Sequence, residues 1–332
     1  MKVAQPTRAR IVDALAELTH AARILFLICI GAVHPGSAET KDESAEPNRE
    51  YLGQAVCEGC HRIETEHWTD TIHADVFLRN PRTVLERRGC EACHGPGSDH
   101  LSDPTDGSKI MAFTREGDRS AGEMNAVCLR CHSGGARIHW PGSTHESEEL
   151  ACSDCHQLMS KISSTSLLRE TSVKRTCFSC HPAQRVEFRK RSHMPLFEGK
   201  IDCHDCHQVH GSATDPLLRA GSTFELCTNC HTDKRGPFLW EHAPVTEGCT
   251  SCHLPHGSNR LSLLVTSPPF LCQQCHAQIG IANHPIELLT RENLGSGGIA
   301  ANRDPRIIGR GCVNCHVQIH GSNHPSGARF HR

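Results

Sequence analysis

The chemistry-bearing feature of this 332-residue sequence is the pattern Cys-x-x-Cys-His, which occurs ten times. The first cysteines of the ten copies are Cys57, Cys90, Cys128, Cys152, Cys177, Cys203, Cys227, Cys249, Cys272 and Cys312. The second cysteines are Cys60, Cys93, Cys131, Cys155, Cys180, Cys206, Cys230, Cys252, Cys275 and Cys315. The histidines that come next are His61, His94, His132, His156, His181, His207, His231, His253, His276 and His316. Of the 21 cysteines only Cys29 falls outside the pattern.

Two thiols followed at once by an imidazole form the attachment motif of haem c. The thiols make thioether bonds to the porphyrin, and the adjacent imidazole binds the iron from one face. Zinc sites also use Cys-x-x-Cys pairs, and exported chains also form disulfides, but neither requires a histidine after every second cysteine. The pattern therefore predicts ten covalently attached haem c groups, with the ten histidines as proximal iron ligands.

The motifs alternate between two types and indicate a repeat of two-haem modules. Residues 203–212 (CHDCHQVHGS) and 249–258 (CTSCHLPHGS) are near duplicates, and residues 312–322 (CVNCHVQIHGS) add one residue. The second, sixth, eighth and tenth motifs carry a second histidine just downstream, whereas odd-numbered motifs have one 8 to 13 residues further on. We expect five modules, starting near residues 57, 128, 177, 227 and 272.

The repeat supplies one further ligand candidate per motif. These predicted distal ligands are His73, His100, His145, Met159, His193, His210, His242, His256, His284 and His320. Met159 stands where the duplicated motifs have histidine, and a His/Met haem would have a raised potential. The alternative is that Met159 packs against a ring while His139 ligates. His139 and His324 are reserve ligands, and which haem each candidate serves stays open.

Ten irons with two protein ligands each leave no open position for a substrate, so we expect an electron-transfer protein rather than an enzyme. A net charge of −2 and the lack of a basic patch with interleaved aromatics exclude nucleic-acid binding.

The chain divides into three predicted parts. Residues 1–38 read as a signal peptide, with a basic start, an apolar run of ten (24–33) and small residues before a cleavage point. An uncleaved anchor is the alternative, although such a run falls short of the roughly 20 residues that span a bilayer. Residues 39–50 are a charged, disordered linker, and 51–332 form the decahaem domain.

The fold class expected of that domain is a multihaem cytochrome. Aromatic residues make up only 4% of the sequence, too few for an ordinary core. We expect short α-helices and coil wrapped around a chain of ten haems, with no substantial sheet.

Several tracts resemble the MtrA/DmsE-type decahaem cytochrome family, which includes MtrA, MtoA and PioA. They are residues 90–100 (CEACHGPGSDH), 227–258 (CTNCHTDKRGPFLWEHAPVTEGCTSCHLPHGS), 271–276 (LCQQCH) and 315–327 (CHVQIHGSNHPSG). The resemblance implies a cytochrome inside an outer-membrane porin-like β-barrel, with periplasmic electron carriers and an extracellular multihaem cytochrome as candidate partners. The best-known member has histidine at all distal positions, so Met159 departs from the family.

The resemblance implies electron flow between periplasmic carriers and extracellular iron or other donors and acceptors. The expected location is the periplasm, associated with the outer membrane. A polar chain of haems that crosses a membrane needs a barrel with a polar lumen between itself and the lipid. Inward flow from Fe(II) is the favoured direction. The alternatives are outward flow in metal reduction, a soluble periplasmic carrier to a terminal reductase such as a dimethyl sulfoxide reductase, and an enzyme with an unligated haem.

Overall fold

The computed structural model describes residues 49–276, 312–314 and 316–330. It divides the chain into two units, 1–49 and 50–332, and all ten motifs belong to the second. The predicted signal peptide, most of the charged linker and the distal candidate His284 lie outside the described residues.

The second unit is built from short helices joined by turns and coil. The α-helices are α2 (Gln54–Glu58), α3 (Arg62–Thr69), α4 (Ile72–Ala74), α5 (Glu91–His94), α6 (Ser98–Ser102), α7 (Ala121–His132), α8 (Thr144–Ser147), α9 (Cys152–Cys155), α10 (Val173–Phe178), α11 (Pro182–Glu187), α12 (Cys203–Cys206), α13 (Thr223–Thr228), α14 (Ala243–Glu247) and α15 (Phe270–His276). One π-helical segment is η1 (Asp75–Arg79). The 3-10 turns are η2 (Glu86–Arg88), η3 (Gly107–Lys109), η4 (Gly135–Arg137), η5 (Thr232–Lys234), η6 (Cys249–Ser251), η7 (Leu261–Leu263) and η11 (Cys312–Asn314).

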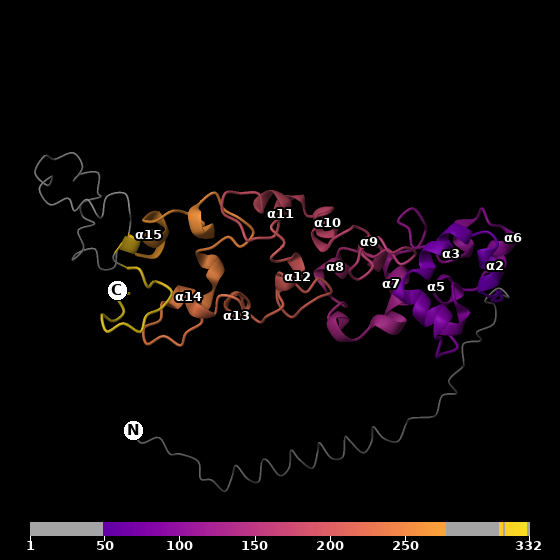
Figure 1. Cartoon of the computed structure of the whole chain (residues 1–332), viewed down its shortest axis with the longest axis horizontal. Coiled ribbons are helices and arrows are strands. Elements are labelled where there is room, and N and C mark those ends of the chain that lie inside the picture. The colour runs from indigo at the N-terminus through magenta and orange to yellow at the C-terminus, as the bar shows by residue number, and fades with distance from the viewer. Residues whose placement is uncertain (1–48, 277–311, 315, 331–332) are drawn as a thin grey trace, which may run out of the picture. The chain divides into compact units, whose positions relative to one another are not determined.

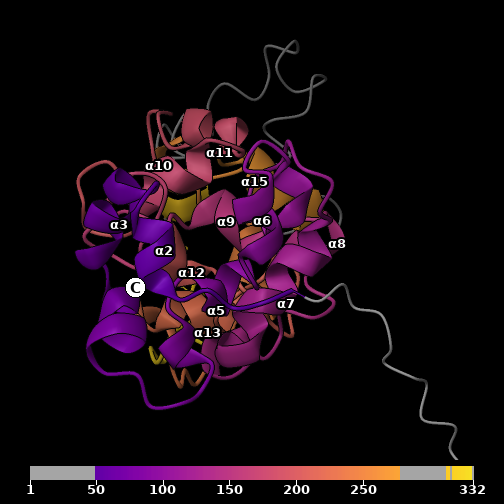
Figure 2. The same ribbon diagram turned by 90° about the vertical axis from the view of Figure 1, so that its right-hand side faces the viewer.

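Among these residues the β-structure consists of isolated bridges, such as Ser192 with Ser258 and Trp240 with Ser322. The prediction of short helices and coil without a substantial sheet is therefore confirmed for the described part of the chain. In Figure 1 the helices run broadly in chain order along the long axis, from α2 near one end to α15 near the other, although α6 lies beside α2. The end-on view in Figure 2 shows them distributed around that axis rather than stacked in layers.

The two types of motif sit differently on the helices. Odd-numbered motifs begin within α2, α7, α10, α13 and α15 and end at or beyond the C-terminal end of the helix. Even-numbered motifs fall in short turns of their own, α5, α9, α12, η6 and η11. Helices α7, α10 and α13 each begin after a serine, Ser120, Ser172 or Ser222, whose hydroxyl accepts from a backbone N–H three residues on. Such N-caps fix where a helix starts, and hence where its motif ends up.

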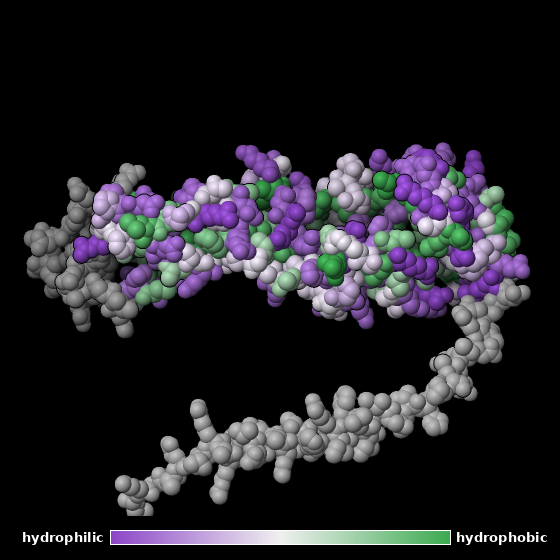
Figure 3. Space-filling model, turned by 90° about the horizontal axis from the view of Figure 1, so that it is seen from below, coloured by the Kyte–Doolittle hydropathy of each residue, from purple (hydrophilic) through white to green (hydrophobic). Residues whose placement is uncertain are grey.

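The apolar core of protein atoms is small. One buried cluster contains Ala121, Met124 and Ala151, with Met111 and Phe113 packed against it. Polar and apolar residues are interspersed over the face shown in Figure 3. The described residues contain no helix that combines the length and the hydropathy needed to cross a bilayer. So little buried apolar mass fits a fold in which porphyrin rings complete the interior.

Candidate haem-binding sites

The thiols of the motifs lie in five close pairs. In each pair the thiol of the first cysteine of an odd-numbered motif interacts with the thiol of the first cysteine of the next even-numbered motif. The pairs are Cys57–Cys90, Cys128–Cys152, Cys177–Cys203, Cys227–Cys249 and Cys272–Cys312. Burial is the main reason that the pKa of Cys90 rises to about 11.

A second set of interactions joins one thiol pair to the next. Here the second cysteine of an even-numbered motif interacts electrostatically with the second cysteine of the following odd-numbered motif. These interacting pairs are Cys93–Cys131, Cys155–Cys180, Cys206–Cys230 and Cys252–Cys275. The two kinds of interaction alternate, so the ten motifs form one uninterrupted row in sequence order.

Seven pairs of imidazole rings have centroids 6.0 to 6.3 Å apart, and each pair combines a motif histidine with a predicted distal ligand. The pairs are His61–His100, His132–His73, His181–His145, His156–His210, His207–His256, His276–His242 and His253–His320. Metal–nitrogen bonds are about 2 Å long, and a ring centroid lies about 1 Å behind its nitrogen, so two imidazoles on one iron should have centroids about 6 Å apart. The spacing fits a haem iron between the rings.

The ring pairs obey a rule that the sequence left open. The histidines of motifs three, five and nine each pair with a distal candidate that lies earlier in the chain, in the segment after the previous odd-numbered motif. Those of motifs four, six and eight meet a ligand from the segment that follows the next even-numbered motif. The first motif is an end case, since His61 meets His100 from the second. Apart from that end case, each of these sites is shared between two modules.

Even-numbered motif histidines are oriented by the chain itself. In each, Nδ1 donates to a backbone carbonyl downstream: His94 to Met111 (2.7 Å), His156 to Ser166 (2.8 Å), His207 to Pro216 (2.9 Å), His253 to Ser262 (2.7 Å) and His316 to Arg329. A carbonyl can only accept, so Nδ1 carries the proton and Nε2 is left for iron. Such outer contacts fix the tautomer and orientation of a metal-binding histidine. The acceptors are backbone atoms, and the sequence held no signal for them.

The loops that carry His210, His256 and His320 dock closely on earlier parts of the chain. A Cβ on Gly257 would lie 1.9 Å from the carbonyl oxygen of Glu187. Ser258 and Ser192 exchange two backbone hydrogen bonds of 2.9 and 2.7 Å, and Ser322 does the same with Trp240 at 2.9 Å. The Gly-Ser pair after each of these histidines therefore positions a ligand for a distant motif. The repeated His-Gly-Ser in the sequence was the available signal for this role.

Burial keeps several distal candidates neutral. It lowers the pKa of His210 to about 4, with smaller contributions from nearby positive groups. Burial is also the main cause of the lowered pKa values of His73, His242 and His320. Metal ligands must be deprotonated, so these environments favour the iron-binding form. The Nδ1 atoms of His73 and His100 are buried without a hydrogen-bond partner, so these two rings lack the fixed tautomer seen in the even-numbered motifs.

Other distal candidates are placed differently. His193 donates from Nδ1 to the Lys190 carbonyl at 2.7 Å, and its Nε2 lies 3.1 Å from Glu198. The hydrogen bond to Lys190 is the main cause of the raised pKa of the imidazole, and Glu198 raises it further. Met159 is half-buried, and its backbone N–H donates to Gln157 at 3.3 Å. Of the reserves, His139 is exposed, and Nδ1 of His324 accepts from Ser326 within a local turn.

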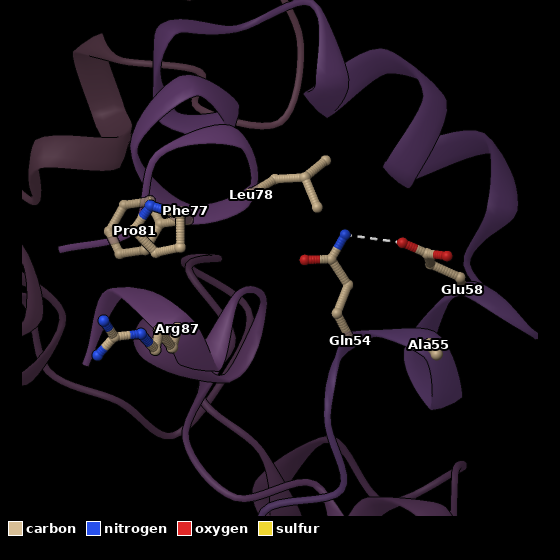
Figure 4. Close-up of a pocket in the computed structure, with 7 residues that line it drawn as sticks. All are labelled: Gln54, Ala55, Glu58, Phe77, Leu78, Pro81 and Arg87. Carbon is tan, nitrogen blue, oxygen red and sulfur yellow. Dashed lines mark hydrogen bonds between the residues drawn. The ribbon is translucent and has the colours of Figure 1, made fainter. Parts of the chain in front are cut away.

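A separate pocket of about 360 Å³ lies beside α2 (Figure 4). Its lining is Gln54, Ala55, Glu58, Phe77, Leu78, Pro81 and Arg87, and Gln54 donates to Glu58 across one side at 2.7 Å. No lining residue is a histidine or a cysteine, so the pocket contributes no candidate iron ligand.

The sequence is similar to known c-type cytochromes along most of its length. It is 40% identical to the multiheme cytochrome MtrA of Shewanella baltica over 294 residues, covering 87% of this chain and 84% of that protein. It is 30% identical to the cytochrome c-type protein NrfB of Escherichia coli over 153 residues, covering 45% of this chain and 77% of that protein. Residues 193–236 and 242–280 match the doubled CXXCH motif family, and residues 90–173 match the NrfB-like cytochrome c family. The residues therefore fit covalently bound haem c, and relatives of this kind are consistent with a place outside the cytoplasm.

Proposed function

Since the chain belongs to the MtrA family of multihaem c-type cytochromes and transfers electrons rather than catalysing a reaction, we propose that it is a ten-haem conduit through the outer membrane. Haem c supplies reversible one-electron chemistry at its iron. The residues of the chain attach the haems, ligate the irons and fix the order of the sites.

The observation that carries this proposal is the alternation of thiol interactions along the chain. Interactions within modules and interactions between modules together link all ten motifs without a gap. An unbroken row is what conduction needs, because each site must have a neighbour on either side. The match to NrfB covers 45% of this chain, so the row extends well beyond the part shared with that protein.

The proposed partner is an outer-membrane porin-like barrel. Charged and polar residues lie on the face of the described chain in Figure 3, and such a surface is costly to expose to hydrocarbon. A barrel with a polar lumen would enclose it. Periplasmic carriers would exchange electrons at one end, and extracellular iron or an extracellular multihaem cytochrome at the other. The predicted signal peptide would deliver the chain to the periplasm.

We favour inward flow from Fe(II) among the directions, because a His/Met haem of raised potential accepts electrons from iron more readily than bis-histidine haems do. Outward flow to metal oxides is the alternative direction. The second candidate function is a soluble periplasmic carrier to a terminal reductase.

Purification from outer membranes tests the conduit. The expected result is a stable complex of the chain with a β-barrel protein, and electron transfer from an enclosed dye to external iron when both are placed in liposomes. A Cys203→Ala, Cys206→Ala double variant, which lacks one haem in the middle of the row, should conduct far more slowly than a Ser251→Ala control. Recovery of the chain only in the soluble fraction, without a barrel, would contradict the conduit and favour the carrier.

A further inference from the structure

The histidine of the second motif, His94, is not a member of the seven ring pairs. It is oriented for iron by the bond from Nδ1 to the Met111 carbonyl. The pairs of motifs four, six and eight all take their distal ligand from the segment after the next even-numbered motif. Applied to the second motif, the same rule selects the segment that follows the fourth.

The residue at the ligand position of that segment is Met159. It lies three residues after His156, as His210 lies three after His207 and His256 three after His253. The surrounding loop keeps the frame of its counterparts, because the backbone N–H groups of Gln157 and Gln208 each donate at 2.7 Å to a leucine carbonyl, that of Leu167 or Leu217. We infer that Met159 is the sixth ligand of the haem attached at Cys90 and Cys93 and held by His94.

Packing between the second and fourth motifs supports this assignment independently of the rule. The segment 111–115 leaves His94 and runs to α9, which carries the fourth motif. Phe113 contacts the His94 ring edge-on, with centroids 5.5 Å apart, and Met111 and Phe113 pack against the buried cluster that includes Ala151. Arg115 then donates from Nε to Asp154 in α9 at 2.9 Å. Met159 follows the end of α9 by four residues, so it lies in the loop that leaves the helix to which the His94 segment is joined.

Lys161 is the competitor within the loop. Ser163 is buried and accepts from Thr165 N–H at 3.1 Å, as Ser212 accepts from Thr214 at 3.3 Å. If the two loops are aligned on these serines instead of on the motif histidines, Lys161 takes the place of His210, because each lies two residues before its serine. Lys161 is exposed and Met159 half-buried, and a lysine must lose its proton before it can ligate. Both observations favour the methionine sulphur.

This assignment rests on the row of haems proposed above and sharpens it. Thioether ligation stabilises ferrous iron and raises the potential. The second haem, close to the N-terminal end of the row, should therefore be reduced before the bis-histidine haems in a titration.

The test uses the complete holoprotein in its ferric form. We expect a methionine charge-transfer band with the intensity of one haem in ten. Met159→Leu keeps the side-chain volume but removes the sulphur, so it should abolish the band and leave one high-spin haem. Met159→His should abolish the band while all haems stay low-spin. Met194→Leu and Lys161→Ala serve as matched controls and should leave the spectrum unchanged.

An experimental density map of the holoprotein supplies the position directly, and should join Sδ of Met159 to the iron that binds His94. A band that is absent or survives Met159→Leu, a high-spin haem produced by Lys161→Ala, or a map that joins Met159 to another iron would overturn the inference. The intact mass reports the number of attached haems separately. A mass short of ten haems would therefore count against the proposed row rather than against this ligand.

Discussion

Two loops of the molecule share a backbone arrangement but carry different candidate ligands. They follow the fourth and sixth motifs and comprise residues 157–168 and 208–218. Both turn back so that the motif histidine bridges a leucine, His156 with Leu168 and His207 with Leu218. The sixth-motif loop presents His210 on a Gly-Ser pair, whereas the fourth-motif loop presents Met159 and has no glycine. Local backbone contacts thus orient the motif histidine. The residue type at the ligand position of the loop can change without altering those contacts.

Removal of the ligand from the sixth-motif loop should have the largest effect on a site. His210→Ala takes away the partner of His156, whose ring centroid lies 6.1 Å away, so one haem loses its sixth ligand. We expect one high-spin haem in ten in the electron paramagnetic resonance spectrum. His67→Ala is the control, because His67 is exposed and outside the ligand register. An entirely low-spin His210→Ala protein would show that the two loops do not share a ligand-delivering role.

Gly211→Ala should disturb the same loop through its backbone. Gly211 has φ +107°, and an added Cβ would lie 1.9 Å from the carbonyl oxygen of His139. We expect a loss of about 3 kcal/mol in the free energy of unfolding, from overpacking and from the unfavourable φ. Denaturant titration followed by haem absorbance measures it. Gly134→Ala, with negative φ and open space around its Cβ, should change stability little. Equal effects of the two substitutions would refute the close approach.

Asn125 holds the helix of the fourth motif, α9, against α7. Its buried side chain donates to the Leu150 carbonyl at 2.9 Å and accepts from the Cys152 N–H at 2.7 Å, tying α7 to α9. Asn125→Ala leaves both backbone groups unpaired and should cost about 2 kcal/mol. Differential scanning calorimetry should show a lower Tm. An unchanged Tm would mean that water replaces the amide at no cost.

The smallest effect is expected at the turn serines of the two loops. Ser163→Ala and Ser212→Ala each remove a hydroxyl that accepts one backbone N–H. We expect about 1 kcal/mol for Ser163→Ala, whose side chain is buried, and less for the half-buried Ser212. Urea titrations compare them directly, and a larger loss at Ser212 would contradict the ordering.

Much of the candidate site could be predicted from sequence because covalent attachment fixes residue type and spacing. The motif cysteines and histidines are readable at once, and the residues around Ser120 and Glu123 form a capping box that is visible in the sequence. The helices and coil followed from the scarcity of large apolar residues. Local chemistry of this kind needs no knowledge of the fold.

The pairing of ligands could not be predicted, because it depends on contacts between distant segments. His156 and His210 are 54 residues apart in the numbering and meet only through docking of one module on another. His193 illustrates a different limit, since a neighbouring carboxylate, that of Glu198, competes for the nitrogen expected to ligate. The sequence offered His193 as a ligand but gave no means of weighing that competition.

The position of a distal ligand in the chain, before or after its motif, decides when each site can be completed. Proteins fold N-terminal parts first as they are made and exported. An odd-numbered site such as that of His181 takes His145 from chain already delivered, so it can be completed at once. An even-numbered site such as that of His207 must wait for His256, which lies 49 residues further on. During maturation the most recently attached even-numbered haem should therefore lack its sixth ligand until the next module has been exported.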